Sequence, residues 1–402
     1  MTLSAAVGQS QSPEARQAGL EAAKQALERL GKMRPAFAWV MASSSLATQQ
    51  VLVGVMDLLG DIPLLGLSTS AELTSAGRSK RSVVVGLFGG DDIDARCGWW
   101  QDFVQDSRNC TQNMLRTLQP DASEGEIIML VADGLSGDAN YLCEALSASE
   151  CAVAGCLAGG DVGRGRTYQM GGRQSGSGGL AAMVLGGNIV IGVGAAHGWH
   201  PIGALGQLTR VQGQWVRTLD GQPASETYAR WFGYPAREWA FPPLNDLVRM
   251  YPLGVHEQPD GELVVRSPLL VEADGSLRMN SRLVEGKKID LMIGSLDGCV
   301  HAAEKAAKQA LDSLGPTTPR AALLLVDIAW QTMFEGQPQR EVHIVRQVLG
   351  DAFPGLLCPI FGGYTYGQIA RVNSSDPVQF LNQHIEVILF GDKNVEDETG
   401  AV

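Results

Sequence analysis

Residues 358–368 read CPIFGGYTYGQ, and two earlier stretches follow the same pattern: residues 62–72 read IPLLGLSTSAE and residues 151–161 read CAVAGCLAGGD. In each stretch, apolar residues lead into a glycine, at position 66, 155 or 362, and small or hydroxyl-bearing residues follow. A Glu, Asp or Gln closes the stretch. The recurrence of one pattern at three places predicts a fold assembled from three related units.

Each turn lies in the same sequence context. A short apolar strand and an amphipathic helix are expected before it, and another apolar strand is expected after it. The expected strand, helix and strand cover residues 36–41, 50–59 and 83–88 in the first unit, 127–131, 140–147 and 180–185 in the second, and 321–326, 341–349 and 385–390 in the third. A further helix is predicted ahead of the first unit, at 13–30, and ahead of the third, at 301–314, whereas a linker at 119–125 leads into the second.

Between residues 208 and 293 the pattern changes to short strands separated by glycine-containing turns, with one helix at 224–232. The sequence therefore predicts an α/β fold in which repeated strand–helix–turn–strand units form layered sheets, with a β-rich insert at the start of the second half. We divide the chain into an N-terminal helical segment (residues 1–33), an N-terminal domain (34–200) and a C-terminal domain (201–402).

The composition is that of a globular protein, and we expect it to be cytoplasmic. The net charge of the 402 residues is −12 and no basic stripe is present, so nucleic-acid binding is not expected. Seven cysteines at irregular spacings predict reduced, mostly buried thiols. Residues 178–196 carry no charge, but a Gly-Gly-Asn turn signal in their middle favours two buried strands over a membrane-spanning helix. No signal peptide is expected at the N-terminus, which lacks an apolar stretch.

The glycine in each turn suggests a physical reason for the repeat. Without a Cβ, the backbone reaches conformations and close approaches that other residues do not allow. The residues after the glycine then lie at strand ends, and we expect the three turns to gather around a cavity that admits a small ligand. The predicted polar lining consists of Ser68, Thr69, Glu72, Tyr364, Thr365, Tyr366 and Gln368. A purely structural turn, copied by duplication, is the alternative.

Several of these stretches resemble motifs of one protein family. The sequence FGGYTYGQI at residues 361–369 resembles the signature of the FIST C-terminal domain, and LGLSTSAE at 65–72 is similar to a segment of the FIST N-terminal domain. Further similar motifs lie in order along the chain, at residues 197–203, 219–224, 251–254 and 284–286. Two residues depart from the family pattern: Gly363 replaces the usual Phe, and Gln368 replaces the usual Glu. Loss of that carboxylate puts an amine ligand in doubt here.

The resemblance implies a bacterial sensor in signal transduction that binds a small ligand such as an amino acid or another metabolite. It also implies a separate signalling partner, such as a histidine kinase or a cyclic-di-GMP enzyme, since this chain matches only the two sensor halves. Some family members bind haem and sense nitric oxide. A haem-based nitric-oxide sensor is therefore the sharpest form of the hypothesis, and a haem-free metabolite sensor is the alternative. The sequence is compatible with a homodimer.

A b-type haem requires an axial ligand and a large apolar cavity. His197, His200 and His256 are the alternative iron ligands, because each follows or lies within an apolar approach to the core. His197 and His200 also have the spacing of a zinc-binding pair, but no second motif accompanies them. For any one of these histidines, a hydrogen-bonded structural side chain is the competing interpretation. His301, His343 and His384 are interpreted as surface positions.

We expect a binding protein and not an enzyme. The sequence contains no G-x-S-x-G nucleophile motif and no phosphate-binding P-loop motif. The remaining enzymatic hypothesis uses carboxylates of the acidic turns, namely Glu72, Asp133 and Asp161. A chain with 43 acidic residues brings such carboxylates together by chance.

Overall fold

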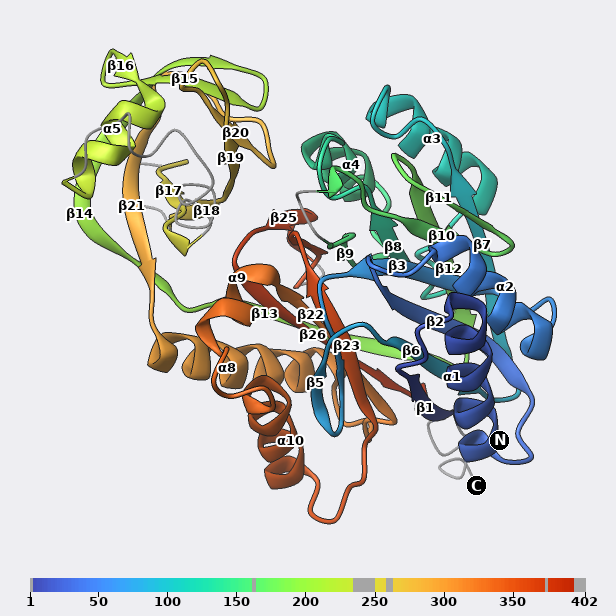
Figure 1. The fold of residues 1–402 in the computed structure, drawn as a ribbon. Coiled ribbons are helices and arrows are strands. Elements are labelled where there is room, and N and C mark those ends of the chain that lie inside the picture. Colours follow the sequence, from blue (N-terminus) through green and yellow to red (C-terminus); the bar gives the residue numbers. More distant parts are fainter. Residues whose placement is uncertain (1–2, 161–163, 234–249, 258–262, 373–374, 394–402) are drawn as a thin grey trace.

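The computed structural model describes residues 3–160, 164–233, 250–257, 263–372 and 375–393. Three similar units share one plan: a strand, a helix, a second strand, one or two helices, a third strand and, after a hairpin, a last strand (Figure 1). The first unit comprises β1 (Ser4–Ser10), α1 (Ala15–Leu30), β2 (Pro35–Ser43), α2 (Thr48–Leu59), β3 (Leu64–Thr69) and β6 (Val83–Gly89). The α/β fold of repeated units is thus confirmed.

The other two units repeat this order. The second comprises β7 (Ile93–Trp100), α3 (Ser107–Leu118), β8 (Ile127–Ala132), α4 (Ala139–Ser147), β9 (Ala152–Leu157) and β12 (Leu180–Gly187). The third comprises β13 (Val190–His197), α8 (Leu296–Leu314), β22 (Ala321–Asp327), α9 (Ile328–Met333), α10 (Arg340–Ala352), β23 (Ile360–Thr365) and β26 (His384–Gly391). In all three sheets the strands lie in the order first, last, second, third, and only the second and third strands are parallel.

The units exchange hairpins in a closed cycle. The hairpins are β4–β5 (Glu72–Thr74 and Gly77–Ser79), β10–β11 (Gln169–Gly171 and Gln174–Gly176) and β24–β25 (Gln368–Ala370 and Gln379–Leu381). The hairpin of the first unit pairs with β23 of the third, that of the second pairs with β3 of the first, and that of the third pairs with β9 of the second. Each sheet is therefore completed by a different unit.

The repeated glycine is explained by the approach of neighbouring strands. A Cβ on Gly66, Gly155 or Gly362 would lie 2.6, 2.1 or 2.1 Å from a carbonyl oxygen of the adjacent parallel strand. The carbonyl groups belong to Val40, Leu130 and Leu324 respectively. Real Cβ atoms do not approach backbone oxygens this closely, so the third strand of each unit needs glycine at this position.

Apolar side chains fill the space between the three sheets. Phe88 stacks on Phe37 at 4.4 Å between ring centroids and contacts Phe361 and Phe390 of the third unit. The helices cover the outer faces, and α1 and α8 do so with rows of alanine. Small side chains on both surfaces let α8 lie very close to β13, since a Cβ on Gly194 would be 2.0 Å from the Ala306 oxygen.

The predicted β-rich insert is confirmed between β13 and α8. It contains β14 (Trp199–Gln212), β15 (Trp215–Leu219), β16 (Gln222–Pro223), α5 (Ala224–Trp231), β17 (Leu253–Val255), β18 (Val264–Arg266), β19 (Pro268–Val271), β20 (Leu277–Met279) and β21 (Lys288–Gly294). These strands form a separate sheet with its own apolar core, which is the lobe at the upper left of Figure 1.

The insert also contacts the second unit. Gln214 donates from Nε2 to the Gly137 carbonyl at 3.0 Å, and Arg278 donates from Nη2 to the Leu135 carbonyl at 3.1 Å. The lobe is therefore attached to the third unit through the chain and through polar contacts, and to the second unit through polar contacts.

One element of the second unit was predicted wrongly. Helix α3 (Ser107–Leu118) occupies the place of the helix that precedes the second strand in the other units, where a linker alone was expected. Its sequence SRNCTQNMLRTL has few apolar residues, although Cys110, Met114 and Leu118 recur at helical spacing and are buried. The side chain of Asp106 caps this helix by accepting a hydrogen bond from the Asn109 amide at 3.0 Å. The first strands β1 and β7 were not predicted either.

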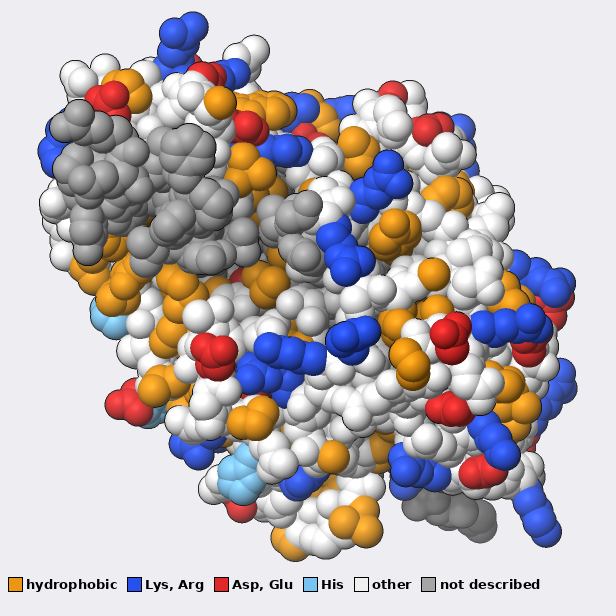
Figure 2. All heavy atoms as spheres, in the orientation of Figure 1, with side chains coloured by type: hydrophobic (Ala, Val, Ile, Leu, Met, Phe, Trp, Pro, Cys, Tyr) orange, Lys and Arg blue, Asp and Glu red, His pale blue; other side chains and the backbone are white. Residues whose placement is uncertain are grey.

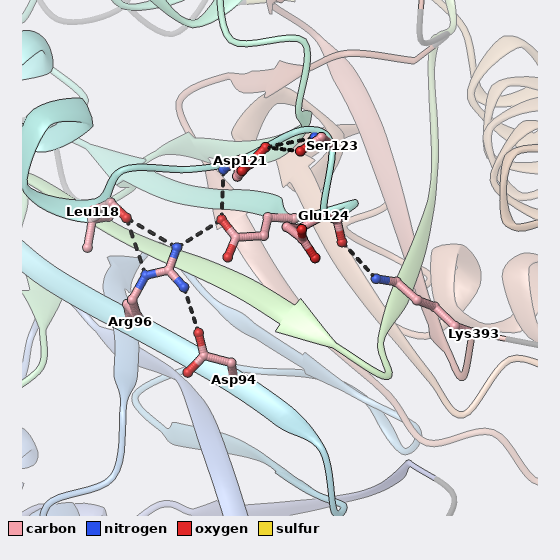
Figure 3. A network of polar contacts seen from close by, with 8 residues as sticks. Asp94, Arg96, Leu118, Asp121, Ser123, Glu124 and Lys393 are labelled. Atoms are coloured by element: carbon pink, nitrogen blue, oxygen red, sulfur yellow. Dashed lines mark hydrogen bonds and ion pairs between the residues drawn. The ribbon is translucent and has the colours of Figure 1, made fainter.

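A polar network attaches the loop after α3 to the end of the last strand (Figure 3). Arg96 on β7 donates to Glu126 at 2.8 Å and to the Leu118 carbonyl at 3.2 Å. Lys393, just after β26, donates to the Glu124 carbonyl at 3.1 Å. Figure 2 shows basic side chains in small separate groups, interspersed with Asp and Glu, on the face of the molecule that it draws.

The apolar stretch at 178–196 forms strands β12 and β13 joined by a turn at Gly187, as predicted. Within the described parts of the chain, none of the helices has the length and apolar character needed to cross a membrane. All seven cysteines are free thiols, and five of them are buried. Burial raises the pKa of Cys110, Cys143, Cys299 and Cys358 to about 12, which keeps these thiols protonated and unreactive.

Candidate functional site

The three repeat turns meet at the centre of the molecule. The Ser68 hydroxyl of the first turn donates to the Gly159 carbonyl of the second at 2.8 Å. The Ser70 amide donates to the Tyr364 carbonyl of the third turn at 3.1 Å, and the Tyr366 amide donates back to Leu157 at 3.2 Å. The turns are thus hydrogen-bonded to one another around the approximate threefold arrangement of the units.

The side chains predicted to line a cavity here are engaged by protein groups. All seven are buried. Thr69 donates to Glu72 at 2.6 Å, Tyr364 donates its phenolic hydrogen to Glu341, and Tyr366 donates to the Gly160 carbonyl. These contacts hold the turns in place, and binding of a ligand by these residues stays a prediction.

Glu72, Gln169 and Gln368, each at the start of an exchanged hairpin, perform one structural task. Glu72 accepts hydrogen bonds from the Ser82 amide and hydroxyl at 3.1 and 2.6 Å. Gln169 accepts from the Gly179 amide at 3.1 Å. Gln368 donates to the His384 carbonyl at 3.2 Å when its amide is oriented so that both of its ends find partners. Each side chain joins the base of an exchanged hairpin to the start of the last strand of its own unit.

Gln169 is a residue that the sequence comparison of the turns missed. The second turn was aligned to end at Asp161, which lies outside the described residues. The structural counterpart comes eight positions later, because the second unit has a longer connection before its hairpin. Asp133, the other carboxylate of the enzymatic hypothesis, accepts from Thr167 at 2.8 Å and from two backbone amides that follow it, those of Leu135 and Ser136.

Burial raises the pKa of Glu72 to about 7, against the lowering effect of its hydrogen bonds from Ser82 and Thr69. A raised pKa means that the folded protein holds the proton more tightly than the unfolded chain, so stability falls as pH rises from about 4.5 to 7. We expect Glu72→Gln to remove this slope, which for one group is at most about 1.4 kcal/mol per pH unit. Urea unfolding at pH 4.5, 6 and 8 measures it. Identical pH dependence in both proteins would contradict the assignment.

A second location has the properties of a ligand site. An open pocket of about 670 Å³, here called the junction pocket, lies between the insert and the third unit. Pockets of this size at the boundary of two lobes commonly bind small molecules. Its described polar and aromatic lining includes His197, Trp199, His200, Arg266, Lys305, Gln309, Asp376, Gln379, Phe380, Asn382 and His384.

Two imidazoles lie side by side in this pocket. The ring centroids of His197 and His384 are 4.8 Å apart, in an edge-on arrangement. His384 Nδ1 lies 2.6 Å from the Asn382 carbonyl, so this nitrogen carries a hydrogen and Nε2 has a free lone pair. The Trp199 amide donates to His197 Nδ1 at 3.2 Å, which places the hydrogen of a neutral His197 on Nε2.

The pocket is electrostatically positive at His384. Burial, together with the charges of His197, Arg266 and Lys305, lowers the pKa of this imidazole to about 3, against the raising effect of its hydrogen bond to Asn382. His384 is therefore neutral at neutral pH. The sequence interpretation of His384 as a surface position missed its place in the pocket, although its position at the start of an apolar strand was visible.

The predicted iron ligands fall in two places. His197 and His200 line the junction pocket, His197 half-buried and His200 exposed. His256 lies in the insert, where Nε2 is 2.7 Å from the Asp290 carboxylate. No cluster of three His, Cys, Asp or Glu side chains suited to a metal ion occurs among the residues that the structure describes.

Sequence comparison identifies the class of protein. The chain matches the FIST N domain over residues 36–222 and the FIST C domain over residues 224–371. It therefore belongs to the FIST-domain proteins, and FIST domains are associated with small-ligand sensing in signal transduction. No curated protein sequence matches the chain.

Several solved structures show distant similarity. A chorismatase is 8% identical, with 97% of this chain and 99% of that chain covered and a TM-score of 0.35. A cyanuric acid hydrolase from A. caulinodans is 11% identical, with 46% and 71% covered and a TM-score of 0.26. A second cyanuric acid hydrolase, described as an evolutionary innovation by structural concatenation, is 8% identical, with 98% of this chain and 100% of that chain covered and a TM-score of 0.32. TM-scores this low support no conclusion about activity.

Proposed function

We propose that this FIST protein is a sensor, and not an enzyme, that binds its small ligand in the junction pocket. The observation that carries the proposal is the convergence of His197, His384, Arg266 and Lys305 on a pocket whose walls come from two lobes. A ligand that contacts both lobes favours the arrangement in which both contacts form. A separate partner, such as a histidine kinase or a cyclic-di-GMP enzyme, would read that change in equilibrium.

Thermal stabilisation by a panel of amino acids, other metabolites and haemin tests the proposal. A ligand that binds the folded state raises the melting temperature. Ala195→Leu puts a larger side chain on the half-buried pocket wall. We expect it to weaken ligand affinity at least tenfold and so to reduce the thermal stabilisation. Ala5→Leu is the matched control, since Ala5 is also half-buried on the first strand of a unit but lines a different pocket. Equal effects of both substitutions, or no stabilisation by any compound, would reject this site.

Haem is the second candidate, because the pocket offers a suitable axial ligand. Iron-ligating imidazoles usually donate their other N–H to a carbonyl or carboxylate, as His384 does to Asn382. Arg266 and Lys305 would pair with the two propionates. Bound there, a b-type haem would supply the iron that takes up nitric oxide.

Haemin titration followed by absorption spectroscopy tests the haem proposal. We expect a Soret band that is shifted or lost in His384→Ala or His197→Ala, the two imidazoles that face the pocket. The band should be unchanged in His256→Ala, because that ring bonds to Asp290 in the insert. A protein that stays colourless with haemin, or a band sensitive only to His256→Ala, would leave the metabolite sensor as the proposal.

A further inference from the structure

We infer that the junction pocket is built for a ligand that carries a carboxylate, and that Arg266 is the residue that binds this group. The inference rests on the proposed function, since it names the chemistry of the ligand that the sensor takes. It depends on a guanidinium whose hydrogen bonds and charge are only partly satisfied by the protein.

The hydrogen bonds of Arg266 leave one side of the guanidinium without partners. Nη1 donates to the Phe380 carbonyl at 3.0 Å and to its neighbour Val265 at 3.2 Å. Nε is buried and has no acceptor. Nη2 makes no hydrogen bond to any residue that the structure describes. Nε and Nη2 together form the edge of a guanidinium that accepts a carboxylate through two parallel hydrogen bonds.

The charge of Arg266 is also only partly compensated. Among the described residues no carboxylate forms an ion pair with it, and burial lowers its pKa against the opposing charge of Glu257. Carbonyl groups satisfy its hydrogens without neutralising its charge. A partly buried cation that forms no ion pair favours the binding of an anion beside it.

The surrounding groups favour an anion as well. Lys305 on α8 lines the pocket, and His197 accepts at Nδ1 from the Trp199 amide, which leaves Nε2–H as its donor. The charges of Arg266 and Lys305 both act on His384. Asp376 is the acidic side chain in the described lining, against these two permanent cations. A bound carboxylate would therefore lie in a net positive environment.

Acetate is the simplest probe of this site, with sodium chloride at equal ionic strength as the reference. We expect acetate to shift the NMR signals of the His197 and His384 imidazoles saturably in the millimolar range, and chloride to shift them far less. Arg266→Gln should weaken the apparent affinity for acetate at least tenfold, and Lys305→Gln should weaken it by a smaller factor. Arg217→Gln is the control, because Arg217 lies in the same lobe but pairs with Asp274.

Titration of the His384 imidazole distinguishes the effect of the Arg266 charge from the effect of its hydrogen-bonding geometry. Arg266→Gln without ligand should raise the pKa of His384, because the Arg266 charge lowers it. Saturating acetate should also raise that pKa, because an anion favours the imidazolium. Arg266→Lys retains the positive charge but lacks the pair of N–H groups that bind a carboxylate together. It should therefore leave the pKa of His384 low and yet bind acetate more weakly than the wild type does.

A second pair of measurements distinguishes the sources of the carboxylate. Succinate and its neutral diamide, succinamide, represent free metabolites, and haemin represents a carboxylate on a large ring. Stabilisation by succinate but not by succinamide, lost in Arg266→Gln, supports a metabolite. Haemin binding weakened by the same substitution supports a propionate.

The two proposals fail in different ways. Absence of a saturable acetate shift in a folded wild-type protein would overturn the carboxylate inference. A ligand whose binding is lost in Ala195→Leu but unaffected in Arg266→Gln would also overturn it, while leaving the sensor proposal intact. Ligand binding that ignores both substitutions would remove both proposals.

Discussion

Replacing Glu386 by Met is expected to stabilise the protein at pH 8, by roughly 3 kcal/mol. Glu386 lies on β26, on the inner face that also carries Ile388 and Phe390, and its side chain is fully buried. Neither carboxylate oxygen has a well-formed hydrogen bond to the described part of the chain. Burial raises its pKa well above 4.5, with a small opposing effect from the Gly155 amide. Met fills a similar volume without a polar group to desolvate.

The pH dependence gives the sign of this effect. The unfolded chain releases the proton near pH 4.5, whereas the folded protein retains it, so the wild type loses stability as pH rises above 4.5. The advantage of Glu386→Met should therefore shrink as the pH is lowered toward 4.5. The stability of Glu386→Gln, whose side chain is neutral but still polar, should lie between that of the wild type and that of Glu386→Met. Chemical unfolding at several pH values measures these differences, and a less stable Met variant at pH 8 would refute the account.

Gly155→Ala is expected to destabilise the protein by about 3 kcal/mol or more. The added Cβ would lie 2.1 Å from the Leu130 oxygen and 3.0 Å from the Leu130 carbonyl carbon. The obstacle is backbone in the centre of a sheet, so no side-chain rotation relieves it. Thermal unfolding should show a fall in melting temperature of about 4 °C or more.

Two further glycine variants control for this prediction. Gly66→Ala should cost less, because its closest backbone contact would be 2.6 Å. Gly350→Ala should be neutral or stabilising by about 0.5–1 kcal/mol, since Gly350 lies in helix α10 with open space at its Cβ and alanine favours helix. Equal losses in all three variants would mean that strand approach is not the reason for the repeated glycine.

The three repeated units could be predicted from the sequence because the residues that define each turn lie close together in the chain. Strand approach demands glycine at positions 66, 155 and 362, and the flanking apolar runs follow from buried strands. The insert was readable because turn residues interrupt it at short intervals. These signals depend on neighbours in the chain, which is the information that a single sequence carries.

Contacts between distant segments were not readable. Nothing local shows that the hairpin at Gln368 pairs with β9, or that Gln169 corresponds to Glu72. The junction pocket combines His197 with residues from α8 and the last strand, more than 100 positions later. Arg266 carries no sequence signal, because its distinguishing property, a guanidinium whose hydrogen bonds are only partly satisfied, arises after folding.

The exchange of hairpins has a consequence for how a signal could travel. One wall of the junction pocket is β25, at Gln379, Phe380 and Leu381. This strand belongs by sequence to the third unit, but through β24 it is hydrogen-bonded into the sheet of the second. A ligand that displaces β25 would therefore also displace β24 and the sheet of the second unit, through main-chain hydrogen bonds alone. Because main-chain hydrogen bonds join β25 and β24 to β9, a shift of β25 is expected to be transmitted to the second unit.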